Sequence, residues 1–334
     1  MIQSPLARAT EGAVVSYAID PELAAVVDLI PQRDPDDIEG SRAQMAAMIA
    51  PLNANVDVTG LTITDHDVPG PDGAPPVLVR VYAPEGAPPA GGRPALLDIH
   101  GGGFVVGSVD MEHAFAANVA RTLDALVAVV EYRLAPEHPF PAGLDDCYAA
   151  LTWLHREAAA LGVDTARVAV GGQSAGGGLS AATALLARDR GGPPLCFQFL
   201  GIPELDHRLE TTSMRTFTDT PVWTLPAAKL SWSRYLGPDC TTVSPYASPA
   251  IADDLRGLPP AYVTTMEFDP LRDEGILYAL RMMEAGVSVE LHSYPGTFHG
   301  SALVTSAAVS RRAQKELVDA LRRGLGIAPE PRPT

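Results

Sequence analysis

Ser174 is the residue whose surroundings most clearly indicate chemistry, because it lies in the segment GGQSAGGG, residues 171–178. An apolar run over 166–172 predicts a strand before this segment, and the run 175–188 predicts a helix after it. A sharp strand-to-helix turn strains the serine backbone, and glycines two positions away on each side avoid clashes there. The spacing G-x-S-x-G therefore predicts that the Ser174 hydroxyl projects above the sheet as a nucleophile. The alternative is a glycine-rich turn with a capping serine.

Three consecutive glycines follow a second predicted strand, in the segment DIHGGGFVVGS, residues 98–108. Without side chains, backbone N–H groups can approach a ligand closely. Gly102 and Gly103 are therefore candidates to stabilise an oxyanion, with the N–H of Ala175 as a third donor. The alternative is a phosphate-binding loop, but the segment lacks a following Gly-Lys-Ser/Thr and does not fit G-x-G-x-x-G.

A serine nucleophile needs a base, and a histidine base needs a carboxylate that fixes its tautomer. In folds with this strand-to-helix turn, the chain order is serine, acid, histidine. His207 precedes the later strand ends and fits this order poorly, and His292 lies inside the predicted strand 287–294. His299 follows that strand in the glycine-flanked segment PGTFHGS, so we predict that His299 is the base.

The acid is expected at the end of the preceding strand, 260–268, where the sequence TTMEFDPLRDEG contains four carboxylates. Asp269 stands at the strand end, and Pro270 stops the ladder of backbone hydrogen bonds there. Asp273 and Glu274 fall in the first turn of the next helix, where acidic residues are common. We therefore predict that Asp269 is the acid; the alternative is that it caps the following helix.

The strand pattern predicts a scaffold that could bring these distant segments together. The segments 60–69 and 76–84 flank a turn-forming sequence and predict a hairpin. Later apolar runs do not alternate, which is typical of parallel strands buried on both faces, and they cover 93–100, 125–133, 166–172, 195–202 and 260–268, with a last strand at 287–294. Helices are predicted over 111–123, 143–160, 175–188, 272–285 and 304–325. This alternation predicts a mostly parallel, doubly wound α/β sheet with an antiparallel start.

Two segments lie outside this alternation. Residues 1–55 are alanine-rich with helical spacing, and 203–250 is an insertion at the carboxyl end of a strand, where active sites lie in open sheets. We predict that both form a helical cap over a catalytic domain made of 56–202 and 251–327. The alternative for the insertion is an ordinary surface excursion. Four of its large side chains could line the pocket or only pack cap helices together: Met214, Phe217, Trp223 and Trp232.

Five segments, taken together, resemble the hormone-sensitive-lipase group of α/β-hydrolases, and especially its bacterial carboxylesterases. In order they are HGGGF at 100–104, EYRLAPEHPFPA at 131–142, GGQSAGG at 171–177, DPLRDEG at 269–275 and HG at 299–300. The resemblance covers about residues 75–327 and implies the α/β-hydrolase fold with a helical cap. It also implies a catalytic triad made of Ser174, Asp269 and His299. The oxyanion hole that it implies is made of Gly102, Gly103 and Ala175.

The same resemblance implies supporting roles and an activity. His100 would stabilise the glycine loop, and Arg133 and Glu137 would form a structural ion pair. Members hydrolyse esters of short to medium acyl chains without a metal or cofactor, and many are dimers, which makes a homodimer a candidate assembly. Gln173 departs from the pattern, because relatives usually have Asp or Thr before the serine and an amide supplies no charge.

The composition limits the partners and the compartment. A formal net charge of −16 repels phosphate backbones and anionic lipids, so neither nucleic acid nor a membrane surface is an expected partner. No apolar run approaches about 18 residues, and we recognise no signal peptide. Cys147, Cys196 and Cys240 are far apart and odd in number, which indicates buried thiols in a reducing cytoplasm.

We therefore expect a serine carboxylesterase that acts on a small-molecule ester through an acyl-enzyme. An amidase or a lactonase would use the same residues, because specificity depends on the pocket. A non-catalytic receptor for small ligands is a further alternative. It is disfavoured because such receptors typically lose the base, whereas His299 and Asp269 are both present.

Overall fold

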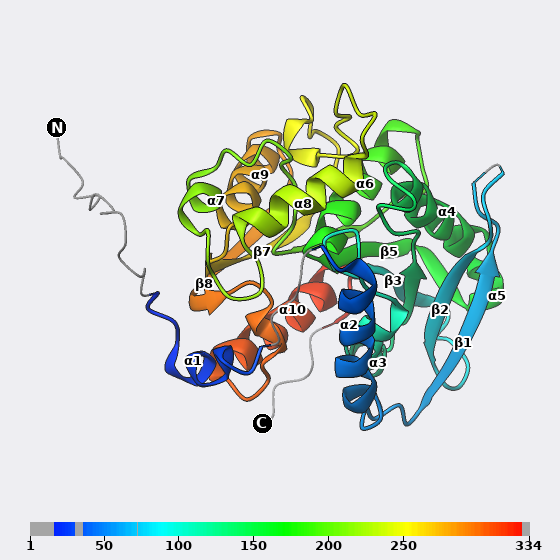
Figure 1. Ribbon diagram of the computed structural model, residues 1–334. Coiled ribbons are helices and arrows are strands. Elements are labelled where there is room, and N and C mark those ends of the chain that lie inside the picture. The colour runs from blue at the N-terminus through cyan, green and yellow to red at the C-terminus, as the bar shows by residue number, and fades with distance from the viewer. Residues whose placement is uncertain (1–16, 31–35, 72, 329–334) are drawn as a thin grey trace, which may run out of the picture.

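The computed structural model describes residues 17–30, 36–71 and 73–328, and its centre is one eight-stranded sheet (Figure 1). The strand order is β1-β2-β4-β3-β5-β6-β7-β8. The strands are β1 Leu61–Val68, β2 Val77–Pro84, β3 Arg93–Ile99, β4 Leu126–Glu131, β5 Val163–Gln173, β6 Phe197–Gly201, β7 Ala261–Phe268 and β8 Val289–Phe298.

The sheet begins antiparallel and continues parallel. β1 and β2 form an antiparallel hairpin, and β2 also pairs antiparallel with β4, where Leu78 lies opposite Glu131. Every later pair of neighbours, from β4–β3 to β7–β8, is parallel. Both features were predicted from the sequence and are confirmed. Because parallel strands end at the same edge of a sheet, the loops that follow β3, β5, β6, β7 and β8 meet there.

Helices cover both faces of this sheet (Figure 1). Side chains of α3 and α10 pack on one face, and those of α4, α6 and α9 pack on the other. The α-helices are α1 Pro21–Val27, α2 Ile38–Asn53, α3 His113–Leu123, α4 Ala142–Arg156, α5 Ala158–Leu161, α6 Ala175–Asp189, α7 Thr212–Thr216, α8 Leu225–Leu236, α9 Arg272–Glu284 and α10 Ala308–Gly324. Short 3-10 helices are η1 Val109–Glu112, η2 Pro249–Ile251 and η3 Ser301–Leu303.

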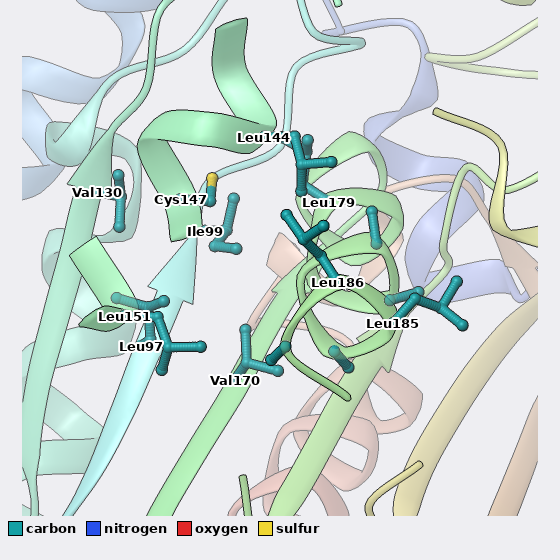
Figure 2. Packing of buried hydrophobic residues seen from close by; sticks show 14 of the residues in the cluster. Leu97, Ile99, Val130, Leu144, Cys147, Leu151, Val170, Leu179, Leu185 and Leu186 are labelled. Atoms are coloured by element: carbon teal, nitrogen blue, oxygen red, sulfur yellow. The ribbon is translucent and has the colours of Figure 1, made fainter. Parts of the chain in front are cut away.

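The largest hydrophobic cluster lies between the centre of the sheet and the helices α4 and α6 (Figure 2). Leu97 and Ile99 of β3 face this side, together with Leu179 and Leu186 of α6. The intervening residue of β3, Leu96, belongs to the cluster on the opposite face. A strand buried on both faces is apolar at most positions, which explains the nearly continuous apolar run in the sequence. The exceptions within β3 are Arg93 and Asp98, which are both buried.

Some element boundaries differ from the prediction. The predicted helix 143–160 is divided, because α4 ends at Arg156 and α5 begins at Ala158. The last strand was predicted to stop at 294, whereas β8 continues to Phe298. Irregular pairing with β7 near its end allows this extension, which brings the strand up to the residue before His299.

The two segments outside the strand–helix alternation are helical where the structure describes them. Between 203 and 258 the chain forms α7, α8 and η2 and no strand, as the sequence predicted. The N-terminal segment contains α1 and α2, again as predicted. Residues 1–16 and 31–35 of the N-terminal segment lie outside the described residues.

The three cysteines all lie in the described part of the chain, and each is a free thiol. Cys147 is buried and Cys196 is half-buried, but Cys240 is exposed in the loop after α8. The expectation of three buried thiols is therefore wrong for Cys240, because its loop runs over the surface of the insertion. Within the described residues, no helix combines the length and apolar character needed to cross a membrane.

Candidate active site

Ser174 lies at the turn between β5 and α6, with φ 57° and ψ −123°. Residues other than glycine rarely adopt such a conformation, which costs about 1–3 kcal/mol. Gly172 and Gly176 make the turn possible, because a Cβ at either position would overlap the carbonyl oxygen of Ile99 on the neighbouring strand. The two flanking glycines thus have the steric role that the spacing predicted.

A buried chain of hydrogen bonds connects the serine to a carboxylate. Ser174 Oγ lies 3.0 Å from His299 Nε2, and His299 Nδ1 lies 2.8 Å from Asp269 Oδ2. A carboxylate only accepts, so Nδ1 carries the ring hydrogen and Nε2 is left to accept the serine hydroxyl hydrogen. Ser174 is 7%, His299 5% and Asp269 0% exposed. The arrangement can therefore remove a proton from the serine in a site largely closed to water.

Two adjacent parallel strands place the acid and the histidine. Asp269 is the residue after β7, and His299 is the residue after β8. Asp269 Oδ1 also accepts the N–H of Leu271 at 2.9 Å, so both of its oxygens have donors. The capping role considered for Asp269 is consequently present in part, because the same side chain holds the turn into α9 and contacts the histidine.

The other two candidate histidines lie away from this chain of hydrogen bonds. His207 Nδ1 lies 3.0 Å from Ser248 Oγ, within the insertion. His292 lies on β8, as predicted, with Nδ1 3.1 Å from a carboxylate oxygen of Glu316 on α10. Neither contact involves Ser174, so the structure brings only His299 of these three residues to the serine.

The glycine loop lies directly beside the serine. A Cβ at Gly101 would be 3.5 Å from the Cβ of Ser174. Gly102 and Gly103 have φ values of 116° and 57°, so this loop conformation strongly favours glycine at both positions. Ala175 is fully buried as the first residue of α6, where a backbone N–H has no partner within the helix. These positions leave backbone N–H groups of both segments as candidate oxyanion donors.

His100 supports the glycine loop from below. Its Nδ1 donates to the carbonyl oxygen of Gly101 at 2.8 Å, and its ring stacks on Tyr132 with 4.2 Å between centroids. Burial lowers the pKa of His100 to about 4, so the ring is neutral at neutral pH. A neutral, fully enclosed imidazole that bonds the loop backbone fits the structural role that the family resemblance implied.

Trp223, from the insertion, reaches both halves of the site. Its ring stacks on that of His299, with 5.6 Å between centroids and 28° between planes. A Cβ at Gly103 would come within 2.8 Å of the same ring. The other three large side chains named above have packing roles: Trp232 contacts Phe104 and Tyr235, Phe217 contacts Tyr17 and Phe268, and Met214 lies in a cluster with Ala228 and Leu271.

The ion pair expected between Arg133 and Glu137 is absent from the described structure, and that prediction is wrong. Arg133 instead forms a two-pronged pair with buried Asp146 of α4, at 2.8 Å for each contact. Glu137 pairs with Arg42 of α2, also at 2.8 Å twice, and this hydrogen bonding lowers the pKa of Glu137 to about 2. Arg133 and Glu137 are close in sequence, but in the folded chain each pairs with a residue of a helix instead of with the other.

Two carboxylates of the segment after β7 connect it to the insertion. Glu274 Oε1 accepts the N–H groups of Leu205 and Asp206 at 2.6 and 3.1 Å, and Asp273 accepts that of Ser213 at 2.7 Å. Glu274 is buried, and burial raises its pKa well above the usual range. The sequence suggested ordinary acidic residues of a first helical turn, but the structure uses them to hold a distant loop.

Glu204, which no sequence motif singled out, is completely buried just after β6. Its backbone N–H donates to the carbonyl of Ser174 at 3.1 Å, and its Oε1 lies 2.9 Å from Ser231 Oγ. A usable signal was present, since the carboxylate directly follows Pro203 at the strand edge where the other site residues were expected.

The fold is shared with a known family of proteins. The family model described as the alpha/beta hydrolase fold matches residues 96–303, which include all of β5 and the glycine loop. The chain therefore belongs to the α/β-hydrolase family. Its resemblance to the hormone-sensitive-lipase-like bacterial carboxylesterases is confirmed by its relatives.

Several named proteins resemble the chain over nearly its whole length. A bacterial heroin esterase structure has 54% identity and a TM-score of 0.89, covering 92% of this chain and 98% of that one. Carboxylesterase NlhH of Mycobacterium tuberculosis is 39% identical, covering 95% of this chain and 99% of the relative. An esterase structure from Pyrobaculum calidifontis has 35% identity and a TM-score of 0.84, covering 93% of this chain and 100% of that one.

Proposed function

We propose that the protein is a serine carboxylesterase that hydrolyses small-molecule esters with short to medium acyl chains. The observation that carries this proposal is the buried chain of hydrogen bonds from Asp269 through His299 to Ser174. Acyl transfer to a serine requires this order of carboxylate, imidazole and hydroxyl. The naming of similar proteins as esterases supports an ester as the substrate.

The reaction proceeds in two steps. His299 accepts the hydroxyl proton as Ser174 attacks the ester carbonyl, and Asp269 stabilises the imidazolium. Backbone N–H groups of Gly102, Gly103 and Ala175 hold the resulting oxyanion. His299 then returns the proton to the departing alcohol, which leaves an acyl-serine. In the second step, water loses a proton to the same histidine and attacks the acyl carbonyl, which releases the acid and restores the serine.

The test is the variant Ser174→Ala, assayed with p-nitrophenyl butyrate. We expect kcat to fall by about three orders of magnitude or more, because nothing replaces the nucleophile. Ser180→Ala is the matched control, since its Oγ bonds the carbonyl of Gly176 within the same helix rather than His299. Turnover of the Ser174 variant near that of the control would contradict the proposal.

The substrate class is tested with p-nitrophenyl esters from acetate to palmitate and a p-nitroanilide of matched acyl length. We expect the highest kcat/KM at short to medium acyl length and little cleavage of the anilide. A preference for the anilide would instead establish an amidase on the same site. Reaction of wild-type protein with a fluorophosphonate, and its loss in Ser174→Ala, separates an intact hydrolytic site from a receptor.

We further propose that residues 1–55 and 203–250 form a cap over the domain made of 56–202 and 251–327. The stacking of Trp223 on His299 supports this division for the insertion. Arg42 of α2 supports it for the N-terminal segment, because its Nε donates to the carbonyl of Val105, just after the glycine loop. A cavity of about 650 Å³ lies between α2 and residues that follow the glycine loop, among them Gly107 and Ser108, so α2 faces open space there.

We also propose that the protein forms a homodimer and is located in the cytoplasm. A homodimer is supported by three exposed apolar side chains on one face of α9, namely Leu277, Leu280 and Met283. A reducing cytoplasm is supported by the three free thiols, one of them exposed. The net charge of −16 favours a small uncharged ester over nucleic acid as the partner.

A further inference from the structure

Glu204 is a completely buried carboxyl group that the reaction described above does not use. Its backbone is fixed at the nucleophile, because its N–H donates to the carbonyl of Ser174 at 3.1 Å. Its side chain lies against α8 of the insertion, with Oε1 2.9 Å from Ser231 Oγ. Its other oxygen, Oε2, is buried without a hydrogen-bond partner in the described structure. A buried carboxylate in this state would be left poorly solvated.

Ser231 connects this carboxyl group to the glycine loop. Its Oγ lies 2.9 Å from Glu204 Oε1 and also 2.9 Å from the carbonyl oxygen of Gly103. A serine hydroxyl has one hydrogen, which can point fully at only one of these two acceptors. Both contacts are good hydrogen bonds if Glu204 carries a proton. The acid then donates to Ser231 Oγ, and Ser231 donates to the carbonyl of Gly103.

The groups around Glu204 favour this neutral form. Asp269, after β7, is an acidic neighbour whose charge raises the pKa of Glu204, and Glu274, on α9, is an acidic neighbour whose own pKa the charge of Glu204 raises. Tyr132, after β4, and Tyr235, on α8, face it as well, and burial raises the pKa of both phenols. None of these four neighbours carries positive charge. Burial, followed by the charge of Asp269, raises the pKa of Glu204 to about 8, although the Ser231 contact lowers it.

We propose that Glu204 is a positioning residue, whose neutral carboxyl group holds the oxyanion loop through Ser231 and Gly103. The inference rests on the proposed esterase function, in which Gly103 is an oxyanion donor. The carboxyl group fixes the serine hydroxyl, and the hydroxyl fixes the Gly103 carbonyl. The insertion thereby orients the peptide group between Gly103 and Phe104. The position of the oxyanion loop then depends on the insertion.

Deprotonation of Glu204 would undo this arrangement. The Ser231 hydroxyl would turn to the new carboxylate, and the carbonyl of Gly103 would lose its donor. A negative charge would also stand beside the loop that must hold a developing oxyanion. Because the protonated form is the more active one, kcat is highest below the pKa of Glu204 and falls as pH rises through about 8. We expect kcat to fall about two- to tenfold as Glu204 loses its proton, which is the effect of losing one hydrogen bond.

The experiment compares pH profiles of kcat for wild type, Glu204→Gln, Glu204→Leu and Ser231→Ala with an uncoloured ester in a pH-stat. Glutamine can donate to Ser231 at every pH, so this variant should retain wild-type kcat at pH 7 and lose the alkaline fall. Glu204→Leu and Ser231→Ala break the connection, so kcat should be about two- to tenfold lower at every pH. KM should change little in all three, because the loop acts on the transition state.

Glu131→Gln is the matched control, because burial also raises the pKa of Glu131 but its carboxylate accepts the N–H of Val109 instead. This variant should keep the wild-type alkaline fall. Circular dichroism across the pH range checks that each variant stays folded. An alkaline fall that persists in Glu204→Gln, or that disappears equally in Glu131→Gln, overturns the proposal.

An infrared difference spectrum of wild type minus Glu204→Gln reports the protonation state without any turnover. A protonated-carboxyl band at pH 7 that disappears above pH 8 is expected, and its absence at pH 7 overturns the proposal. If wild type hydrolyses no ester, the proposed function fails, and this spectrum still decides the state of Glu204. If wild type is active but the spectrum shows no band, only the positioning role fails.

Discussion

At the scale of single residues, the proposed chemistry depends on which ring nitrogen of His299 holds a hydrogen. Asp269 is fully buried, and its two oxygens accept from His299 and from the Leu271 backbone. A carboxylate held by two donors cannot rotate away, so it keeps the hydrogen on Nδ1 and leaves Nε2 free for Ser174. The fixed position of the Asp269 carboxylate therefore keeps His299 Nε2 unprotonated and able to accept the proton of Ser174.

Replacement of this acid tests the point. In Asp269→Asn the amide can present its NH2 group to Nδ1, which favours the tautomer with the hydrogen on Nε2. We expect kcat to fall about a thousandfold to ten-thousandfold with little change in KM, as measured by steady-state hydrolysis of p-nitrophenyl butyrate. Asp273→Asn is the control, because that carboxylate accepts a backbone N–H of Ser213. Equal losses in both variants would argue against a role specific to Asp269.

At the scale of elements, the site is the common edge of parallel strands. β5, β7 and β8 end at Ser174, Asp269 and His299 respectively, each within one residue. At the serine turn β3 lies so close to the chain that no Cβ fits at Gly172 or Gly176, so the turn requires glycine at both positions. This close packing orients the Ser174 hydroxyl, and it leaves no space for larger residues at Gly172 and Gly176.

Gly176→Ala is the corresponding prediction. The added methyl group would overlap the carbonyl oxygen of Ile99, so we expect a loss of about 2–3 kcal/mol in the free energy of unfolding and a large fall in activity. Denaturant unfolding and ester turnover measure the two effects. Gly60→Ala is the control for the steric overlap, since nothing lies within 4 Å of an added Cβ there, although Gly60, unlike Gly176, has a positive φ. It should lose about 1–2 kcal/mol and keep its kcat. A stable, active Gly176 variant would contradict the steric account.

At the scale of the whole molecule, residues far apart in sequence meet around one edge of the sheet. Arg42 of α2 donates to the backbone carbonyls of Val105 and Ala135 and pairs with Glu137. The N-terminal segment therefore contacts the chain both before and after β4. The proposed dimer face is elsewhere, on α9, where Leu280 is 45% exposed between Leu277 and Met283. Assembly can therefore be disturbed without touching the site.

Leu280→Glu tests that face. A charged side chain in the middle of an apolar interface is costly to desolvate, so we expect light scattering to show a dimer for wild type and a monomer for the variant. The activity per chain should persist. Leu52→Glu, on the exposed side of α2, should remain dimeric. A monomeric wild-type protein would remove the dimer from the proposal.

Local patterns in the sequence were enough to predict much of the fold and the residues that the structure brings together. The strand–helix alternation predicted the sheet, because burial on both faces leaves a nearly continuous apolar run. Ser174 and its glycines could be recognised because the steric demands of the turn fall on residues two positions apart. Asp269 could be placed because it directly follows a predicted strand, and His299 because it lies in a glycine-flanked segment after the last predicted strand. Such requirements are imposed over a few neighbouring residues and are therefore visible in sequence.

Other features were decided only by the tertiary structure. The partners of Arg133 and Glu137 come from α4 and α2, and the stacking of Trp223 on His299 joins residues 76 positions apart. Glu204 acquires its character from burial beside Asp269 and Ser231. Partners and burial of this kind depend on how whole elements pack, because a charge finds its counter-charge in space and a pKa responds to the loss of water around it.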